Sequence, residues 1–299
     1  MPEWPDVVVY VERMRAYLVG EPLEKVRLKS VFLVRSVSPP VTAAEGCRVV
    51  GVERSGKRIL VEFDDELFYV IHLMIAGRLR WRKRGAGLPG RAGLAAFDFP
   101  KGSLVWTEAA QRKRASMHVV EGRAGLAAFD RGGLEVFDCT LEEFAARLRS
   151  ENHTLKRSLT SPRLFSGIGN AYSDEILHHA RLSPLTWTSR LDDEEIERLL
   201  ASTRTVLELW AERSREEVGE KFPDKVTAFR DGMAVHGRFR EPCPDCGTPV
   251  QRIVKGENET NYCPTCQTGG KVYADRALSK LLGKDWPKSV EEWEELRDR

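Results

Sequence analysis

Four cysteines toward the end of the chain could together hold a metal ion. Cys243, Cys246, Cys263 and Cys266 form two C-x2-C pairs with sixteen residues between them. This spacing is typical of structural zinc sites, in which each pair sits on a tight turn and aims two thiolates at one ion. Because four thiolates leave no open position, the sequence predicts one structural Zn²⁺ without chemistry at the metal. Two disulfides, or a redox-active C-x-x-C pair, are the alternatives.

A glycine turn that leads into a helix could bind an anion. In SGIGNAYSDEILHHA, residues 166–180, Gly167 and Gly169 precede a helical pattern. The amides of a helix N-terminus after such a turn can receive an anion, and phosphate is the obvious one beside a basic surface. An ordinary turn is the alternative interpretation of the same residues.

Two basic blocks stand out in a chain whose net charge is only +2. They consist of Arg78, Arg80, Arg82, Lys83, Arg84 and Arg91, and of Arg112, Lys113 and Arg114. Segregated charge of this kind favours a polyanionic partner on one face. A solvated basic loop explains the same pattern equally well.

The composition indicates a globular chain of about two domains. Of its 299 residues, 41% are hydrophobic, which is enough for real cores. No apolar run approaches the roughly 20 residues that a membrane span needs, so no membrane partner is expected. The N-terminal MPEWPDVVVY lacks the pattern of a signal peptide. We therefore expect a bacterial-type cytoplasm, with Cys47 and Cys139 as reduced thiols.

Hydrophobic periodicity divides the chain into a β part and a helical part. Residues 5–19 have the spacing of a helix that ends at Gly20. From about 24 to 137, short alternating runs separated by turns predict a β-sandwich or barrel. From about 139 to 219 the pattern is helical, and Thr140 with Glu143 predicts a capping box at its start. The predicted strands include 58–63, 67–73, 103–107 and 117–120, with 250–254 and 260–262 between the cysteine pairs.

Two further features lie outside this pattern. Residues 275–283 and 290–299 are predicted to form short helices. The nonapeptide GRAGLAAFD occurs at 90–98 and again at 122–130. Two copies are too few for a solenoid, and local duplication is one explanation.

Four segments in order resemble the formamidopyrimidine-DNA glycosylase and endonuclease VIII family of base-excision repair enzymes. They are PEWPDV at the N-terminus, HLMIAGRL at 72–79, SGIGNAYSDEIL at 166–177, and AVHGR at 234–238 followed by the ribbon that ends in YCPTCQ. The resemblance covers nearly the whole chain. It implies an α+β fold with an N-terminal helix and β-sandwich domain at 1–137 and a helical helix–two-turn–helix domain at 138–238. A four-cysteine zinc ribbon at 239–270 and a helical tail at 271–299 would follow.

The resemblance also implies a catalytic group at the N-terminus. Pro2 matches the family's nucleophile, the amine that is exposed when the initiator methionine is removed; an α-amine with a pKa near 8 is partly neutral at neutral pH. Glu3 matches the acidic partner that can protonate the sugar or the leaving base. Asp6 stands where the family has glutamate. Lys57 matches a hairpin lysine that contacts DNA phosphate near the lesion.

The implied DNA-binding residues differ from the family pattern more than the implied catalytic residues do. Asn170 and Lys156 match phosphate-contacting residues, and Arg112 matches an arginine that fills the gap left by the extruded base. Ile75, beside Met74, falls on the family's methionine. Arg114 falls on its phenylalanine, Asn258 on the ribbon arginine, and Ser161 with Pro162 on an Asp-Gln pair. Asn258 carries no charge, and charge-assisted contacts are roughly twice as strong as neutral ones.

The function that the resemblance implies is a bifunctional DNA glycosylase with AP lyase activity on oxidised bases. Its partner would be damaged double-stranded DNA, and the protein would be monomeric and associated with the nucleoid. An AP lyase without glycosylase activity is one alternative. A non-catalytic protein that binds damaged DNA on the same scaffold is the other, motivated by Arg114 and Asn258.

Overall fold

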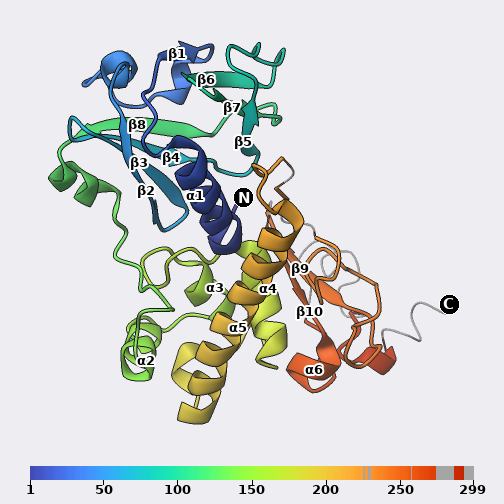
Figure 1. The fold of residues 1–299 in the computed structure, drawn as a ribbon. Helices are drawn as coiled ribbons and strands as arrows, with labels where there is room; N and C mark the ends of the chain where they lie inside the picture. The colour runs from blue at the N-terminus through green and yellow to red at the C-terminus, as the bar shows by residue number, and fades with distance from the viewer. Residues whose placement is uncertain (225, 228–229, 257, 274–285, 293–299) are drawn as a thin grey trace. The chain divides into compact units, whose positions relative to one another are not determined.

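The computed structural model describes residues 1–224, 226–227, 230–256, 258–273 and 286–292 (Figure 1). The chain forms two compact units, Met1–Arg131 with Leu209–Ala228 and Gly132–Glu208 with Phe229–Arg299. The predicted helix at 275–283 and most of the one at 290–299 lie outside the described residues. No helix in the described part of the chain combines the length and the apolar character that crossing a bilayer demands.

The first unit begins with helix α1 (Trp4–Leu18), close to its predicted bounds. Pro5 lies in the first turn, where a missing N–H costs nothing. The carboxylate of Asp6 accepts the backbone N–H of Glu3 at 3.0 Å, which fixes the start of the helix. Val7, Met14 and other apolar residues of α1 pack into the core of this unit.

Two four-stranded antiparallel sheets form the β-sandwich, in the orders β2-β3-β4-β8 and β1-β6-β7-β5. Residues from both sheets contribute to one hydrophobic core, with Phe63 and Tyr69 from the first sheet and Leu104 and Trp106 from the second. The strands are β1 (Lys25–Leu28), β2 (Val49–Ser55), β3 (Arg58–Phe63), β4 (Leu67–His72), β5 (Gly77–Arg82), β6 (Gly93–Phe99), β7 (Gly102–Glu108) and β8 (Ser116–Glu121). The α+β interpretation of the sequence is confirmed.

The two copies of the nonapeptide adopt different structures. Residues 93–98 of the first copy lie in β6, all of whose residues are buried. The second copy forms the 3-10 helix η3 (Arg123–Phe129), which has no buried residue. Shorter 3-10 helices are η1 (Val31–Leu33), η2 (Val41–Ala44) and η4 (Thr188–Arg190).

The second unit contains short helices and the cysteine ribbon. Its helices are α2 (Leu141–Arg149), α3 (Leu155–Thr160), α4 (Asn170–His179) and the first part of α5 (Asp193–Val218). The predicted capping box is present, because Thr140 and Glu143 exchange hydrogen bonds of 2.8 and 3.2 Å. Strands β9 (Gln251–Lys255) and β10 (Asn258–Tyr262) pair as an antiparallel hairpin, and α6 (Pro264–Thr268) follows. Figure 1 shows this hairpin beside α4.

Candidate functional sites

The N-terminal residues of the first unit lie in a cluster of charged groups. Pro2 and Glu3 are buried. Burial lowers the pKa of the Met1 amine below its ordinary value; Glu3 opposes this shift, and Arg78 and Lys57 add to it. These groups are therefore close enough to interact, so the structure brings together the predicted catalytic residues Pro2, Glu3 and Lys57.

Lys57 lies in a two-residue turn between β2 and β3. Ser55 pairs with Arg58, and Gly56 has a φ of 59°, a conformation that favours glycine. The strand register places His72 of β4 opposite Arg58. His72 was not predicted, because its place beside this turn depends on the pairing of β3 with β4. Burial, then Arg58, Lys57 and Arg131, lower the pKa of His72 from 6.5 to about 4.

The lowered pKa of His72 predicts a loss of stability in mild acid. Between the folded pKa of about 4 and the unfolded value of 6.5, the unfolded chain binds more protons at this residue. Stability should therefore fall as the pH falls, by about 1–2 kcal/mol from pH 7 to pH 5. Urea unfolding at both pH values would measure this. His72→Gln should show a smaller fall than the wild type, and equal falls would contradict the prediction.

The loop between β7 and β8 carries two predicted DNA-binding residues, Arg112 and Arg114, both exposed. Glu108, only 1% exposed, anchors the end of this loop. Its carboxylate oxygens accept the backbone N–H of Arg114 at 3.0 Å, and one accepts that of Ala115 at 3.2 Å. Ile75 is 52% exposed in the turn between β4 and β5. All three predicted gap-filling side chains therefore lie on exposed turns of the first unit.

The first basic block is engaged in contacts within its own unit. Arg80 and Arg82 pair with Asp224 at 3.3 and 2.7 Å, and Arg84 pairs with Glu24 at 2.7 Å. Arg78 donates hydrogen bonds to backbone carbonyls, including that of Ile75 at 3.1 Å. These contacts satisfy much of the block, so the charge argument for a polyanion rests on the second block.

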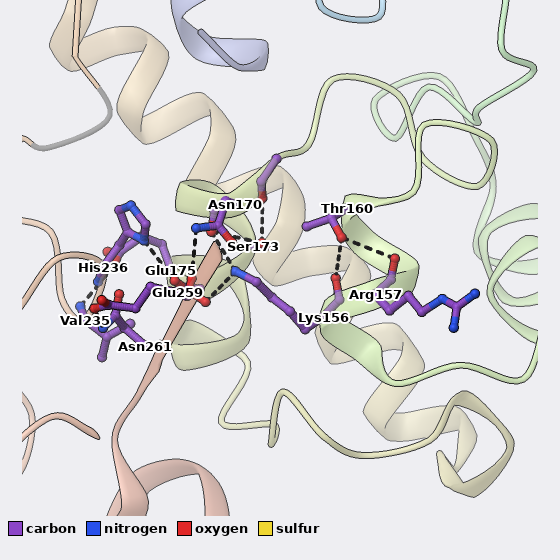
Figure 2. Close-up of polar contacts among 12 residues, drawn as sticks. Lys156, Arg157, Thr160, Asn170, Ser173, Glu175, Val235, His236, Glu259 and Asn261 are labelled. Carbon is purple, nitrogen blue, oxygen red and sulfur yellow. Dashed lines mark hydrogen bonds and ion pairs between the residues drawn. The ribbon is translucent and has the colours of Figure 1, made fainter. Parts of the chain in front are cut away.

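In the second unit, the start of α4 brings Asn170 and Lys156 together (Figure 2). Gly167 has a φ of 79°, which explains a glycine before the helix. Lys156 is 9% exposed, and its ammonium donates to the Asn170 carbonyl at 2.6 Å and to Asp174 at 2.5 Å. The Asn170 side-chain amide donates to the Glu259 carbonyl of β10 at 2.8 Å. Both predicted phosphate contacts are thus held by internal bonds, and Asn170 ties α4 to the ribbon hairpin.

Two buried carboxylates of α4 hold the segment that precedes the ribbon. Asp174 accepts a hydrogen bond from Nδ1 of His236 at 2.8 Å, beside its pair with Lys156. Glu175 accepts the backbone N–H groups of Ala234, Val235 and His236 at 2.7–2.9 Å. Burial raises the pKa of Glu175 although these donors oppose the shift. Figure 2 shows Glu175 next to Val235 and His236.

Replacement of Glu175 by alanine should destabilise the second unit strongly. Two buried N–H groups and one part-buried N–H group would lose their acceptor, at an expected total cost of roughly 3–5 kcal/mol in the free energy of unfolding. Chemical denaturation would measure the change. Glu197→Ala, on the exposed face of α5, is the matched control and should change stability by less than about 0.5 kcal/mol. Equal effects of the two substitutions would refute the anchoring role.

The ribbon places Asn258 at the first position of β10, opposite Lys255 and exposed. Asn258 is far from Asn170 and Lys156 in the sequence. Its neighbour in β10, Glu259, accepts a hydrogen bond on its backbone carbonyl from the side-chain amide of Asn170. The structure therefore joins the hairpin that carries Asn258 to the start of α4 in one unit.

The four cysteines have the geometry of a zinc site. Their Sγ atoms all lie within 4.8 Å of one another, and none of the six cysteines, all of them in the described part of the chain, forms a disulfide. Tetrahedral Zn²⁺ with bonds of about 2.3 Å requires sulfur–sulfur distances of about 3.8 Å. Cys243–Cys266 is 3.9 Å and Cys246–Cys263 is 3.4 Å, far from the about 2.05 Å of a disulfide. The thiolates fit a zinc ion and not the disulfide alternative.

Fold and site together define a class: a β-sandwich protein with a helix–two-turn–helix unit and a four-cysteine ribbon. Three family models match the chain in order. They describe the formamidopyrimidine-DNA glycosylase N-terminal domain at residues 1–120, the H2TH domain of the same enzyme at 135–219, and a zinc finger found in FPG and IleRS at 240–269.

Individual proteins agree with the family models. The formamidopyrimidine-DNA glycosylase of Thermus thermophilus is 31% identical over 281 residues, covering 90% of this chain and 100% of that protein. An uncharacterized formamidopyrimidine-DNA glycosylase-like protein of Mycobacterium tuberculosis is 37% identical over 150 residues, covering 50% of this chain and 93% of that protein. Lactococcus lactis Fpg, solved with DNA containing an abasic site, shares the fold with a TM-score of 0.77 at 23% identity, covering 89% of this chain and 99% of that one.

The chain belongs to the formamidopyrimidine-DNA glycosylase and endonuclease VIII family. Its four cysteines form a structural zinc site, as the sequence predicted. Zinc bound there would fix the two turns that carry the cysteine pairs, with the four thiolates as its ligands.

Proposed function

We propose that this chain is a DNA-repair glycosylase that excises oxidised bases and then cleaves the strand as an AP lyase. The observation that carries the proposal is the charged cluster in which the N-terminal amine, Glu3 and Lys57 interact. Burial lowers the pKa of the Met1 amine there, and we expect burial at the same place to favour the neutral, nucleophilic form of the Pro2 amine once Met1 is removed.

The proposed reaction starts at the amine of Pro2 after removal of Met1. The amine nitrogen attacks C1′ of the damaged nucleotide, and the bond from C1′ to the base breaks. Glu3 donates a proton to the sugar oxygen or the leaving base. Loss of the amine proton and opening of the sugar give a Schiff base between Pro2 and C1′. The iminium acidifies the 2′ proton, and its removal expels the 3′ phosphate and cleaves the strand.

The proposed DNA contacts lie in both units. Lys57, Arg112, Arg114 and Ile75 come from turns of the first unit, and Lys156, Asn170 and Asn258 from the second. Lys156 and Asn170 make internal hydrogen bonds at the start of α4. We therefore propose that they have two roles: they hold the backbone amides of α4 in position to bind a DNA phosphate, and they contact that phosphate. The damaged base must leave the stack to reach the amine, and Ile75 and Arg112 would fill its place.

An AP lyase without glycosylase activity is the second candidate. Asn258 and Arg114 are both exposed and fall where the family resemblance implies a phosphate-contacting arginine and a gap-filling phenylalanine, so their presence is compatible with this candidate as well as with a non-catalytic damage-binding protein. Cleavage at a preformed abasic site does not require recognition of a damaged base. The residues Asn258 and Arg114 would therefore impair AP lyase activity less than glycosylase activity. The zinc ribbon and the N-terminal cluster are compatible with both candidates.

Borohydride trapping tests the proposed function. The wild-type protein is incubated with duplexes that contain an oxidised base or a preformed abasic site, and borohydride reduces any Schiff base to a stable adduct. Adducts with both duplexes support the glycosylase with lyase activity. An adduct with the abasic duplex alone supports the second candidate. No adduct with either, together with tight binding, would leave a non-catalytic damage-binding protein.

A further inference from the structure

The C-terminal end of α4 meets the zinc ribbon through several polar contacts. His178 is 4% exposed, and its Nε2 lies 3.3 Å from Sγ of the zinc ligand Cys243. Arg181 donates to Asp245, between the first two cysteines, at 3.0 Å. Gln267 donates to the Leu182 carbonyl at 2.9 Å and accepts the N–H of Cys263 at 2.8 Å. The helix end is therefore tied to both cysteine pairs.

The chemistry of the metal site decides which atom donates in the contact between His178 and Cys243. A cysteine that binds zinc is a thiolate, so its sulfur has no proton to give and can only accept. The nearest carboxylate oxygen, on Asp245, is 3.9 Å from Nε2 and too distant for a hydrogen bond. Nε2 of His178 must then carry the hydrogen and direct it at the sulfur.

We propose that His178 is a positioning residue of the zinc centre, which donates an N–H···S hydrogen bond to the Cys243 thiolate and so couples the metal to α4. Four thiolates around Zn²⁺ carry a net charge of −2. A buried donor offsets part of this charge and holds the thiolate in place. Loss of such a supporting hydrogen bond typically weakens metal binding about 10–100-fold.

The coupling has a consequence for the other end of the helix. Asn170 begins α4, and His178 lies eight residues later, a helical rise of about 12 Å. Between them, Asp174 and Glu175 hold residues 234–236. The metal thus fixes one end of a helix whose other end carries the proposed phosphate site. The zinc interaction itself is independent of the proposed catalytic function.

Zinc transfer to a chelator tests the proposal in the holoprotein. His178→Phe keeps a flat ring without a donor and should lose zinc about 10–100-fold faster than the wild type. His178→Gln keeps an N–H donor and should restore most of the difference. His179→Phe is the matched control, because the exposed His179 bonds to Ser202 at 2.9 Å, away from the metal. The proposal would be overturned if His178→Phe lost zinc at the wild-type rate. It would also be overturned if His178→Phe and His178→Gln lost zinc equally faster than the wild type.

A second measurement needs no substitution, so it remains decisive if His178→Phe fails to fold. The wild-type protein is loaded with ¹¹³Cd in place of zinc, and the imidazole groups are observed by NMR. A scalar coupling between ¹¹³Cd and the Nε2 proton of His178 is expected, because the hydrogen bond connects them through the Cys243 sulfur. A His178 that carries its proton on Nδ1 alone, without such coupling, would overturn the assignment.

Discussion

Replacement of Pro2 by leucine is expected to abolish borohydride-trapped adducts and to lower strand cleavage at abasic sites by at least about a thousandfold. Leucine is too large to permit removal of Met1, so residue 2 would stay inside an amide and have no nucleophilic nitrogen. Pro2→Gly permits removal but replaces a ring-constrained secondary amine by a mobile primary one. It should retain a small fraction of the trapping. Quantified adducts on abasic duplexes would measure both effects.

Two controls make this result specific to the amine. Mass spectrometry of the wild-type N-terminus should show a chain that begins at Pro2. The Pro2→Gly variant and the wild-type protein should bind a non-cleavable abasic analogue with similar affinity, because both lose Met1 and differ only in the amine that reacts. Undiminished adducts with Pro2→Leu would reject the N-terminal nucleophile. Lys57, which interacts with the same cluster, would then be the candidate amine.

Loss of a zinc ligand should have the largest effect on the fold. Cys263→Ser is expected to lower the affinity for zinc by more than about a hundredfold, beyond the cost of losing a supporting hydrogen bond. Structural zinc contributes about 10–16 kcal/mol to comparable small folds at neutral pH. The amides of β9 and β10 should therefore lose their protection from hydrogen exchange. Zinc content and exchange rates, measured on the same sample, would test this.

The chain offers a matched control for the zinc ligand. Cys47 lies in the first unit and is a free thiol outside the ribbon. Cys47→Ser should keep a full complement of zinc and a protected hairpin. If Cys263→Ser also kept both, the four-thiolate site would be wrong.

Features of short sequence range were largely predictable from the sequence. The C-x2-C pairs and the capping box of Thr140 and Glu143 depend on residues a few positions apart, and the structure has both as predicted. The strand at 58–63 was found with its predicted bounds because its apolar pattern is local. The resemblance added the N-terminal cluster, since neither Pro2 nor Lys57 has a recognisable pattern of its own.

Contacts between distant residues were not predictable. The first basic block suggested a polyanion, but Arg82 pairs with Asp224, which lies 142 residues away. His72 acquires its lowered pKa only when β4 pairs with β3 and is buried. The sequence around Lys156 predicted a phosphate contact, yet in the structure its ammonium donates hydrogen bonds to Asp174 and to the Asn170 carbonyl. In each case the partner is set by the fold.

The repeated nonapeptide separates what the sequence determines from what the tertiary structure decides. In the first copy, Phe97 is buried in the core and Asp98 pairs with Arg27 at 2.7 Å, because β1 and β7 flank the strand on both sides. In the second copy, Gly122 ends β8 with a φ of 72°, and Phe129 lies half-buried against His118 and Arg58. The sequence alone determined the zinc ligands and the local periodicity. Only the tertiary structure decided which copy becomes a strand, because hydrogen-bonding partners and burial come from residues distant in the chain.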